Sequence, residues 1–106
     1  MLRSFSYAAF AGLKKYEEEH AGAPAESTSE WAMAWQNAAS AEFLTAYRET
    51  IAAKPDAGKP GLLPEAAETQ KLLDAYLLEK ALYELLYELN NRPAWLHIPI
   101  AGILTL

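Results

Sequence analysis

Hydrophobic positions recur at helical spacing along most of the chain and predict three long helices. Over residues 2–19, apolar side chains return every three or four positions, at Leu2, Phe5, Ala9, Leu13 and Tyr16. Over residues 29–52, a wide stripe suited to a helix with two neighbours comprises Trp31, Trp35, Ala38, Ala39, Phe43, Ala46, Tyr47 and Thr50. The third helix covers residues 65–90, and Pro99 can begin a short last helix through Leu106. The pattern predicts an all-α helical bundle.

Capping and turn residues mark the expected boundaries. Ser27 and Glu30 fit the Ser-x-x-Glu capping box after a linker at residues 20–28. Residues 54–64 contain three prolines and two glycines, which predicts a loop. Residues 90–93 read Asn-Asn-Arg-Pro, so we expect the third helix to end there in a left-handed Asn conformation before a proline that cannot continue it.

The first helix begins without an N-cap and in the middle of its apolar pattern, so we suspect that the natural sequence continues upstream. It ends on three glutamates, residues 17–19, which oppose the helix dipole and predict a frayed end. A solvated terminus explains this triplet better than a metal site, because octahedral oxygen sites need ligands from several segments.

The segment at residues 72–93 is the one around which the chain is organised, because both of its sides are occupied. One side carries Leu78, Leu82, Leu85 and Leu89 with Ala75 and Ala81. The other carries Tyr76, Lys80, Tyr83, Glu84, Tyr87 and Asn91. We expect the leucine side to face a core. Three tyrosines are unusual on a solvated face, so we expect that side to contact something; the simpler alternative is that the tyrosines pack on other helices and Lys80–Glu84 is a surface pair.

Composition supports a small helical domain and excludes some partners. The chain has 106 residues, 52% of them hydrophobic and 22% charged, which suits a single soluble domain over residues 1–106 with a small core. It lacks valine and is rich in Ala, Leu and Glu. A net charge of −5 without a basic stripe argues against nucleic acid. No apolar run is long enough for a membrane span, no cysteine is present, and a cytoplasmic location is the default.

The catalytic inventory is short. The chain has no glycine-rich nucleotide motif, no His-Glu-x-x-His and no cysteine nucleophile, so we name no catalytic residue and no metal ligand. Its only aspartates, Asp56 and Asp74, cannot supply both the base and the Mg²⁺ ligands of a phosphotransferase. His20 and His97 stand apart from any paired carboxylate and are expected to be surface or packing residues.

What remains is the set Lys80, Tyr83, Glu84, Tyr87, Glu88, Asn91 and Arg92. Sugars present hydroxyls that donate and accept hydrogen bonds, and apolar ring faces that tyrosines cover. Such a stripe is typical of a carbohydrate site.

The same region resembles the C-terminal end of maltokinases, including those fused behind trehalose synthase. The run LLDAYLLEKALYELLYELNNRPAWLHIPIAGIL matches their EKAxYExxYE segment followed by NRPxWxxIPxxG, and MLRSFSYAA is similar to a segment that follows their metal-binding Asp. The resemblance covers residues 1–12 and 72–103, and it implies the final helical part of an aminoglycoside-phosphotransferase-like kinase C-lobe.

The resemblance implies ATP- and Mg²⁺-dependent phosphorylation of maltose to maltose 1-phosphate. It implies sugar contact for the seven residues of the motif: Lys80, Tyr83, Glu84, Tyr87, Glu88, Asn91 and Arg92. Trp95 is a looser candidate for stacking or for fixing the turn, and Arg3, Ser4 and Tyr7 match the first motif and are candidates to line the same pocket.

The family's nucleotide-binding lobe, catalytic loop and metal-binding Asp have no counterpart in this chain. We therefore expect no cofactor in this chain, with ATP and Mg²⁺ used only by the complete kinase, and no phosphate transfer by the chain alone. The missing N-terminal portion is an expected partner, and without it exposed apolar surface favours self-association. The alternatives are a stand-alone helical protein-interaction module and a degenerate remnant.

Overall fold

The computed structural model describes residues 1–22, 25–52 and 65–106. Every regular element in these ranges is helical: α1 (Leu2–Glu19), α2 (Ala25–Ala52), α3 (Ala66–Asn91), the 3₁₀ turn η1 (Pro93–Trp95) and α4 (His97–Leu104). The described residues form two compact units, Met1–Thr45 and Ala46–Leu106, and α2 crosses from one to the other. The all-α prediction is confirmed.

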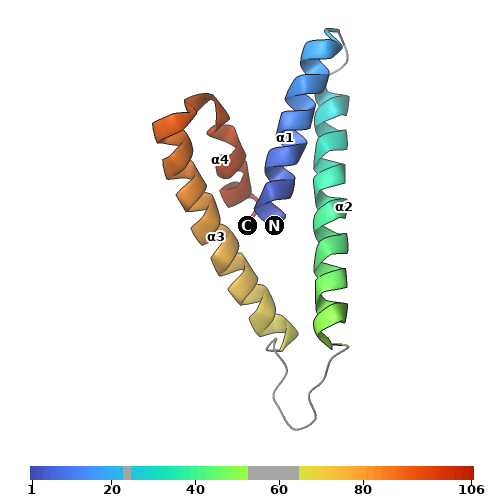
Figure 1. Cartoon of the computed structure of the whole chain (residues 1–106), viewed down its shortest axis with the longest axis vertical. Coiled ribbons are helices and arrows are strands. Elements are labelled where there is room, and N and C mark those ends of the chain that lie inside the picture. Colours follow the sequence, from blue (N-terminus) through green and yellow to red (C-terminus); the bar gives the residue numbers. More distant parts are fainter. Residues whose placement is uncertain (23–24, 53–64) are drawn as a thin grey trace. The chain divides into compact units, whose positions relative to one another are not determined.

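The first unit joins α1 to the first part of α2, and the two helices lie side by side (Figure 1). The ring of Phe5 meets the rings of Trp35 and Phe43 in edge-to-face contacts, with centroids 6.2 and 6.0 Å apart. Between the helices, the buried hydroxyl of Ser6 accepts hydrogen bonds from Gln36 Nε2 at 2.7 Å and from Arg3 Nη1 at 3.2 Å. Ala9 is the buried apolar residue of this interface.

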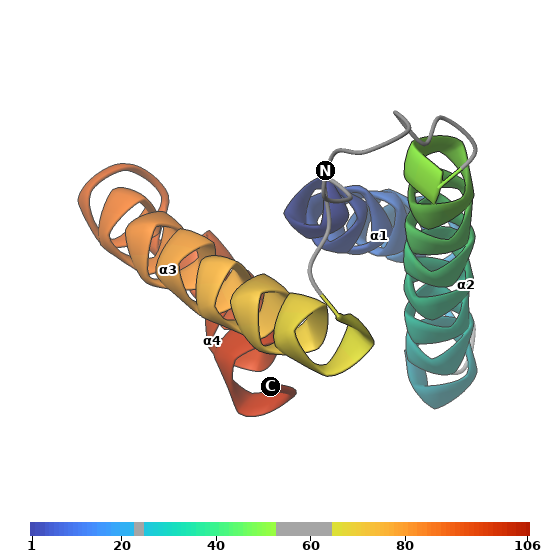
Figure 2. The same ribbon diagram turned by 90° about the horizontal axis from the view of Figure 1, so that it is seen from below.

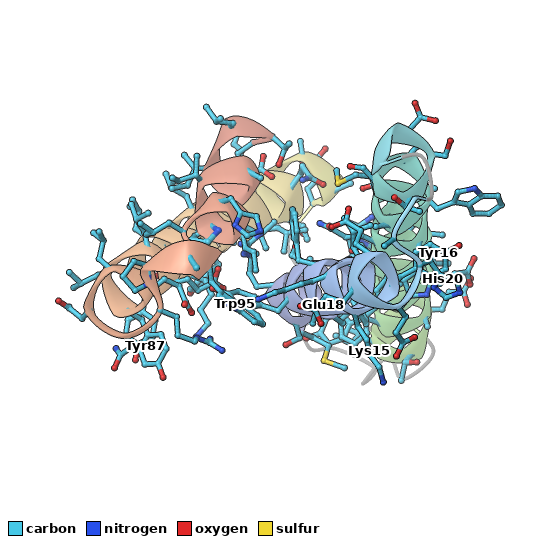
Figure 3. The ribbon with its side chains drawn as sticks, turned by 90° about the horizontal axis from the view of Figure 1, so that it is seen from above. Lys15, Tyr16, Glu18, His20, Tyr87 and Trp95 are labelled. Carbon is cyan, nitrogen blue, oxygen red and sulfur yellow. The ribbon has the colours of Figure 1, made fainter. Side chains whose placement is uncertain are left out.

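The bounds of α1 agree with the prediction, and its start has no side-chain cap, as expected. At its other end the His20 N–H donates to the Tyr16 carbonyl oxygen at 2.9 Å. The His20 ring stacks on the Tyr16 ring, with centroids 4.2 Å apart (Figure 3). His20 is therefore the C-cap residue of α1, which makes it a structural residue of the surface. The predicted fraying of this end stays untested.

The predictions for α2 need two corrections. The helix starts at Ala25, so Ser27 lies inside it and is not its N-cap. Ala25 and Glu26 are good helix formers, and an acidic residue suits a first turn, so the helix can begin before the capping sequence. The expected apolar stripe is also only partly covered, because Trp31 is 77% exposed and Trp35 and Tyr47 are about half exposed. Residues 23–24 and the predicted loop at 54–64 lie outside the described residues.

The second unit is built on α3, along which α4 folds back (Figures 1 and 2). Its core is small: Ala81 on α3 and Ile98 and Pro99 on α4 are buried. Pro99 is the third residue of α4, where its missing N–H costs no helical hydrogen bond because the first N–H groups of a helix have no partner within it. The predicted short last helix is thus confirmed, beginning two residues earlier.

The end of α3 differs from the prediction in its mechanism. The helix continues through Asn91, and Arg92 follows in an extended conformation, with φ −141° and ψ 72°. No described residue other than glycine has a positive φ, so no asparagine takes the left-handed conformation. Pro93 explains the difference, because a residue before proline is driven out of the helical region by a clash with the proline ring. Arg92, rather than Asn90 or Asn91, therefore stops the helix.

Candidate functional site

The buried residues of α3 lie where the two sides expected from the sequence meet. Ala81 comes from the leucine side, Glu84 comes from the tyrosine side, and Glu88 lies between them. On the leucine side, Ala81 is buried and Leu85 is half-buried, whereas Leu78, Leu82 and Leu89 are 40–54% exposed, so only the part of this side nearest Ala81 faces a core. Only residues 92–96 separate α3 from α4, and the two helices are in contact.

The Glu88 carboxylate is buried, and both of its oxygens pair with an arginine. Its side chain is 1% exposed, and its two oxygens accept hydrogen bonds from Arg92 Nη2 at 2.8 Å and Nε at 3.0 Å. This is the bidentate geometry in which a guanidinium matches a carboxylate best. A buried carboxylate is costly unless it is paired in this way, and Arg92, whose side chain is 46% exposed, supplies the partner.

The guanidinium of Arg92 also contacts two aromatic rings. Its Cζ lies 4.4 Å from the centroid of Trp95 and 5.8 Å from that of Tyr87, both within the range of cation–π attraction. Trp95 is half-buried in η1, whereas Tyr87 projects from the last turns of α3 and is 47% exposed (Figure 3). One side chain thus joins the end of α3 to the turn that follows it.

The tyrosine side of α3 is exposed. Tyr83 is 62% exposed, and the Lys80 ammonium lies 4.9 Å from its ring centroid. Asn91 is exposed one turn after Tyr87, to whose carbonyl oxygen its amide donates at 2.9 Å. The alternative in which the tyrosines pack on other helices is not what the structure shows for Tyr76, Tyr83 and Tyr87.

The residues inferred from the family motif therefore fall into two groups. Lys80, Tyr83, Tyr87 and Asn91 present their side chains to solvent along one side of α3. Glu84, at 7% exposure, and Glu88, at 1%, are buried. Arg92 joins the two groups, since it pairs with Glu88 and touches Tyr87. Sugar contact by any of these residues stays a prediction.

The candidates from the first motif belong to the other unit. Tyr7 is half-buried on α1, Ser4 is exposed, and Arg3 donates to the buried Ser6 hydroxyl. The expectation that Arg3, Ser4 and Tyr7 line the same pocket as the α3 residues stays a prediction.

The remaining polar candidates make local contacts. His97 Nδ1 lies 3.1 Å from the carbonyl oxygen of Ala94, within the turn before α4. Asp74 accepts a hydrogen bond from Gln70 at 2.9 Å, and Glu19 lies 4.0 Å from Lys15. Across residues 1–22, 25–52 and 65–106, no three His, Cys, Asp or Glu side chains gather where they could hold a metal ion. None of the helices in these ranges is long and apolar enough to span a bilayer.

Sequence reasoning missed the buried role of Glu88 and the packing role of Ile98 and Pro99. A signal for the first was present: Glu88 and Arg92 are four positions apart at a helix end, with a proline after the arginine. Spacing alone does not distinguish a buried pair from an exposed one, because that depends on what covers the helix.

No protein-family model matches the chain, and no solved structure matches it significantly.

Proposed function

We propose that this chain is the C-terminal helical part of a maltokinase-like enzyme and that the exposed group Lys80, Tyr83, Tyr87 and Asn91 on α3 contacts maltose or a related disaccharide. The resemblance of residues 1–12 and 72–103 to the maltokinase motifs supports the assignment. The observation that carries it is that Lys80, Tyr83, Tyr87 and Asn91 lie exposed along one side of α3 within that motif.

The chemistry of these side chains suits a disaccharide. Each tyrosine offers an apolar ring face and a hydroxyl, Asn91 offers an amide, and Lys80 offers an ammonium donor. Lys80 and Asn91 are also partly fixed by contacts with Tyr83 and Tyr87, which lowers the cost of ordering them on binding. The proposal restricts sugar contact to this exposed group and does not include the buried Glu84 and Glu88.

The proposal assigns the phosphoryl-transfer chemistry to residues outside this chain. ATP and Mg²⁺ would be bound by the rest of the kinase, and the chain would hold only one side of the acceptor. A coupled assay on the purified 106-residue chain is expected to detect no maltose-dependent ATP consumption. Consumption that rises with maltose would contradict this part of the proposal.

A maltose titration followed by the amide signals of residues 83–92 tests the sugar contact directly. We expect saturable shifts in this segment and their loss in Tyr83→Ala. Tyr76→Ala is the matched control, because Tyr76 lies on the same helix outside the motif with similar exposure, 67% against 62% for Tyr83. Shifts that survive Tyr83→Ala, or no shifts at high millimolar maltose, count against sugar binding by this surface.

A second candidate is a helical interaction module, favoured by the exposed leucine side of α3. Leu78, Leu82, Leu86 and Leu89 recur at three- and four-residue spacing and are 40–62% exposed. An apolar stripe of this kind is a common docking surface for a second helix, and a second copy of the chain is the partner that this hypothesis names.

Sedimentation of the chain over a range of concentrations tests this second candidate. Association that is abolished by Leu82→Lys and retained in Tyr83→Lys is expected if the leucine side is the contact. A monomer at all concentrations removes self-association as a function.

A further inference from the structure

The ion pair between Glu88 and Arg92 lies where α3 ends and η1 begins, and it differs from an ordinary surface ion pair. Both carboxylate oxygens of Glu88 are used, at 2.8 and 3.0 Å, and Glu88 is 1% exposed. Arg92 is the residue at which α3 ends and η1 begins, since its N–H donates to the Glu88 carbonyl at 2.8 Å and its carbonyl accepts from the Trp95 N–H at 2.9 Å.

The guanidinium of Arg92 also contacts one aromatic ring on α3 and one in η1. It lies 5.8 Å from the Tyr87 ring on α3 and 4.4 Å from the Trp95 ring in η1. A planar group that is held by two parallel hydrogen bonds has a fixed orientation, and rings that stack on it are oriented with it. Side-chain rotation at Arg92 would therefore disturb both rings at once.

We propose that Glu88 and Arg92 are positioning residues, a clamp that sets the Tyr87 and Trp95 rings and the direction of the chain from α3 into α4, and that neither contacts the sugar. The sugar half of this statement rests on the proposed function, whereas the clamp rests on the geometry alone. It reassigns two of the seven residues for which the family motif implies sugar contact.

The clamp is distinguished from a surface pair by the size of its effect. An exposed pair four positions apart on a helix changes an opening equilibrium by less than about threefold. Here Glu88 is 1% exposed and Arg92 is 46% exposed, and because removing the partner of a buried carboxylate is costly, we expect a change of about tenfold. Lysine keeps the charge of arginine but has neither the planar fork nor the stacking face. Arg92→Lys should therefore behave almost as a loss of the side chain.

Sugar-free NMR of the whole chain tests the clamp. In the wild type, the Arg92 Nε proton should exchange slowly with solvent. Arg92→Lys should shift the Trp95 indole N–H signal and accelerate amide exchange at Trp95 and Leu96 about tenfold. Glu88→Gln should do the same and also remove the protection of Arg92 Nε–H. Arg48→Lys, the same change at an exposed arginine of α2, should alter none of these signals.

A rescue pair separates positioning from general loss of structure. Trp95→Phe keeps a ring against the guanidinium and should leave amide exchange at positions 95 and 96 within about threefold of wild type. Trp95→Ala removes the ring and should accelerate amide exchange more than Trp95→Phe does. Equal effects of the two variants, or an Arg92→Lys chain whose exchange and indole signal match wild type, overturn the clamp.

Maltose titration of the same variants tests the second part of the proposal, that neither Glu88 nor Arg92 contacts the sugar. If Arg92 only positions the rings, Glu88→Gln weakens the maltose-induced shifts although Arg92 is still present. If Arg92→Lys abolishes the maltose response without changing any sugar-free signal, Arg92 binds the sugar and the positioning assignment is wrong. A wild type that gives no maltose response defeats the proposed function, while the sugar-free measurements still decide whether the clamp exists.

Discussion

The two units of this chain are held together by different chemistry over different distances in sequence. In the first unit, neutral groups hold α1 to α2: the Phe5 ring meets Trp35 and Phe43, and Gln36 donates to Ser6 across 30 positions of sequence. In the second, a charged pair only four positions apart fixes the end of α3, and α4 returns immediately onto the same helix.

This difference indicates which unit can form from local sequence alone. A short loop costs less conformational entropy to close than one of 30 positions, so contacts between neighbouring segments are expected to form earlier. The second unit is therefore the one expected to retain structure when the first is disturbed, and substitutions in each unit can test this.

The largest effect is expected where the second unit has its only large buried aliphatic side chain among the described residues. Ile98→Ala removes a side chain that is 1% exposed and should lower the free energy of unfolding of α3 and α4 by about 2–5 kcal/mol, because the cavity is only partly filled by relaxation. Denaturant titration followed by amide signals of each unit measures this. Ile100→Ala, at a 44% exposed site, is the control and should cost much less. Equal loss in both units would remove the distinction between them.

A smaller effect is expected at the aromatic contact of the first unit. Phe5→Leu keeps an apolar side chain but loses two edge-to-face ring contacts, which should cost about 1–3 kcal/mol, at about 0.5–1.5 kcal/mol for each pair. The Trp35 indole signal should shift while the Trp95 signal stays in place. Trp31→Phe, at a 77% exposed position, serves as the control and should leave stability unchanged.

The polar contact between α1 and α2 should contribute less. Gln36→Ala removes the 2.7 Å hydrogen bond to Ser6 and should cost about 0.5–1.5 kcal/mol, with the loss confined to the first unit. Asn37→Ala changes an exposed amide at the next position of the same helix and is the matched control. If both variants lose the same stability, the Ser6 contact is not specific.

The smallest effect is expected at the exposed ion pair between Lys15 and Glu19. Lys15 and Glu19 have the same four-residue spacing as Glu88 and Arg92, but their atoms are 4.0 Å apart and their side chains are 76% and 58% exposed. Lys15→Ala should change stability by less than about 0.5 kcal/mol, an effect that added salt abolishes. A loss comparable to that of Arg92→Lys would show that burial does not separate the two pairs.

The positions of the helices follow closely from the sequence. The bounds of α1 agree with the apolar pattern, and α3 is displaced by one residue from the prediction. The start of α2 was predicted four residues too late, because a capping sequence was preferred over the helix-forming residues before it. These features are local: they depend on residues within one or two turns of each boundary.

The candidate site was predictable only as a set of residues. The pattern placed Lys80, Tyr83, Tyr87 and Asn91 on one side of a helix, and the structure agrees that this side is exposed. It also grouped Glu84 with them and treated Glu88 and Arg92 as equal members of the same set, whereas Glu84 and Glu88 are buried. Helical periodicity reports which residues share a face but not which face a later segment covers.

By itself, the sequence determined that this chain is helical, where its helices end and which side chains share a face, because those properties depend on spacing and on nearby proline, glycine and capping residues. Only the tertiary structure decided which residues of α3 are buried: Ala81, Glu84 and Glu88 are, whereas Leu78, Leu82 and Leu89 stay exposed. The physical reason is that packing follows from the path of the backbone between helices, which periodicity along one helix does not encode.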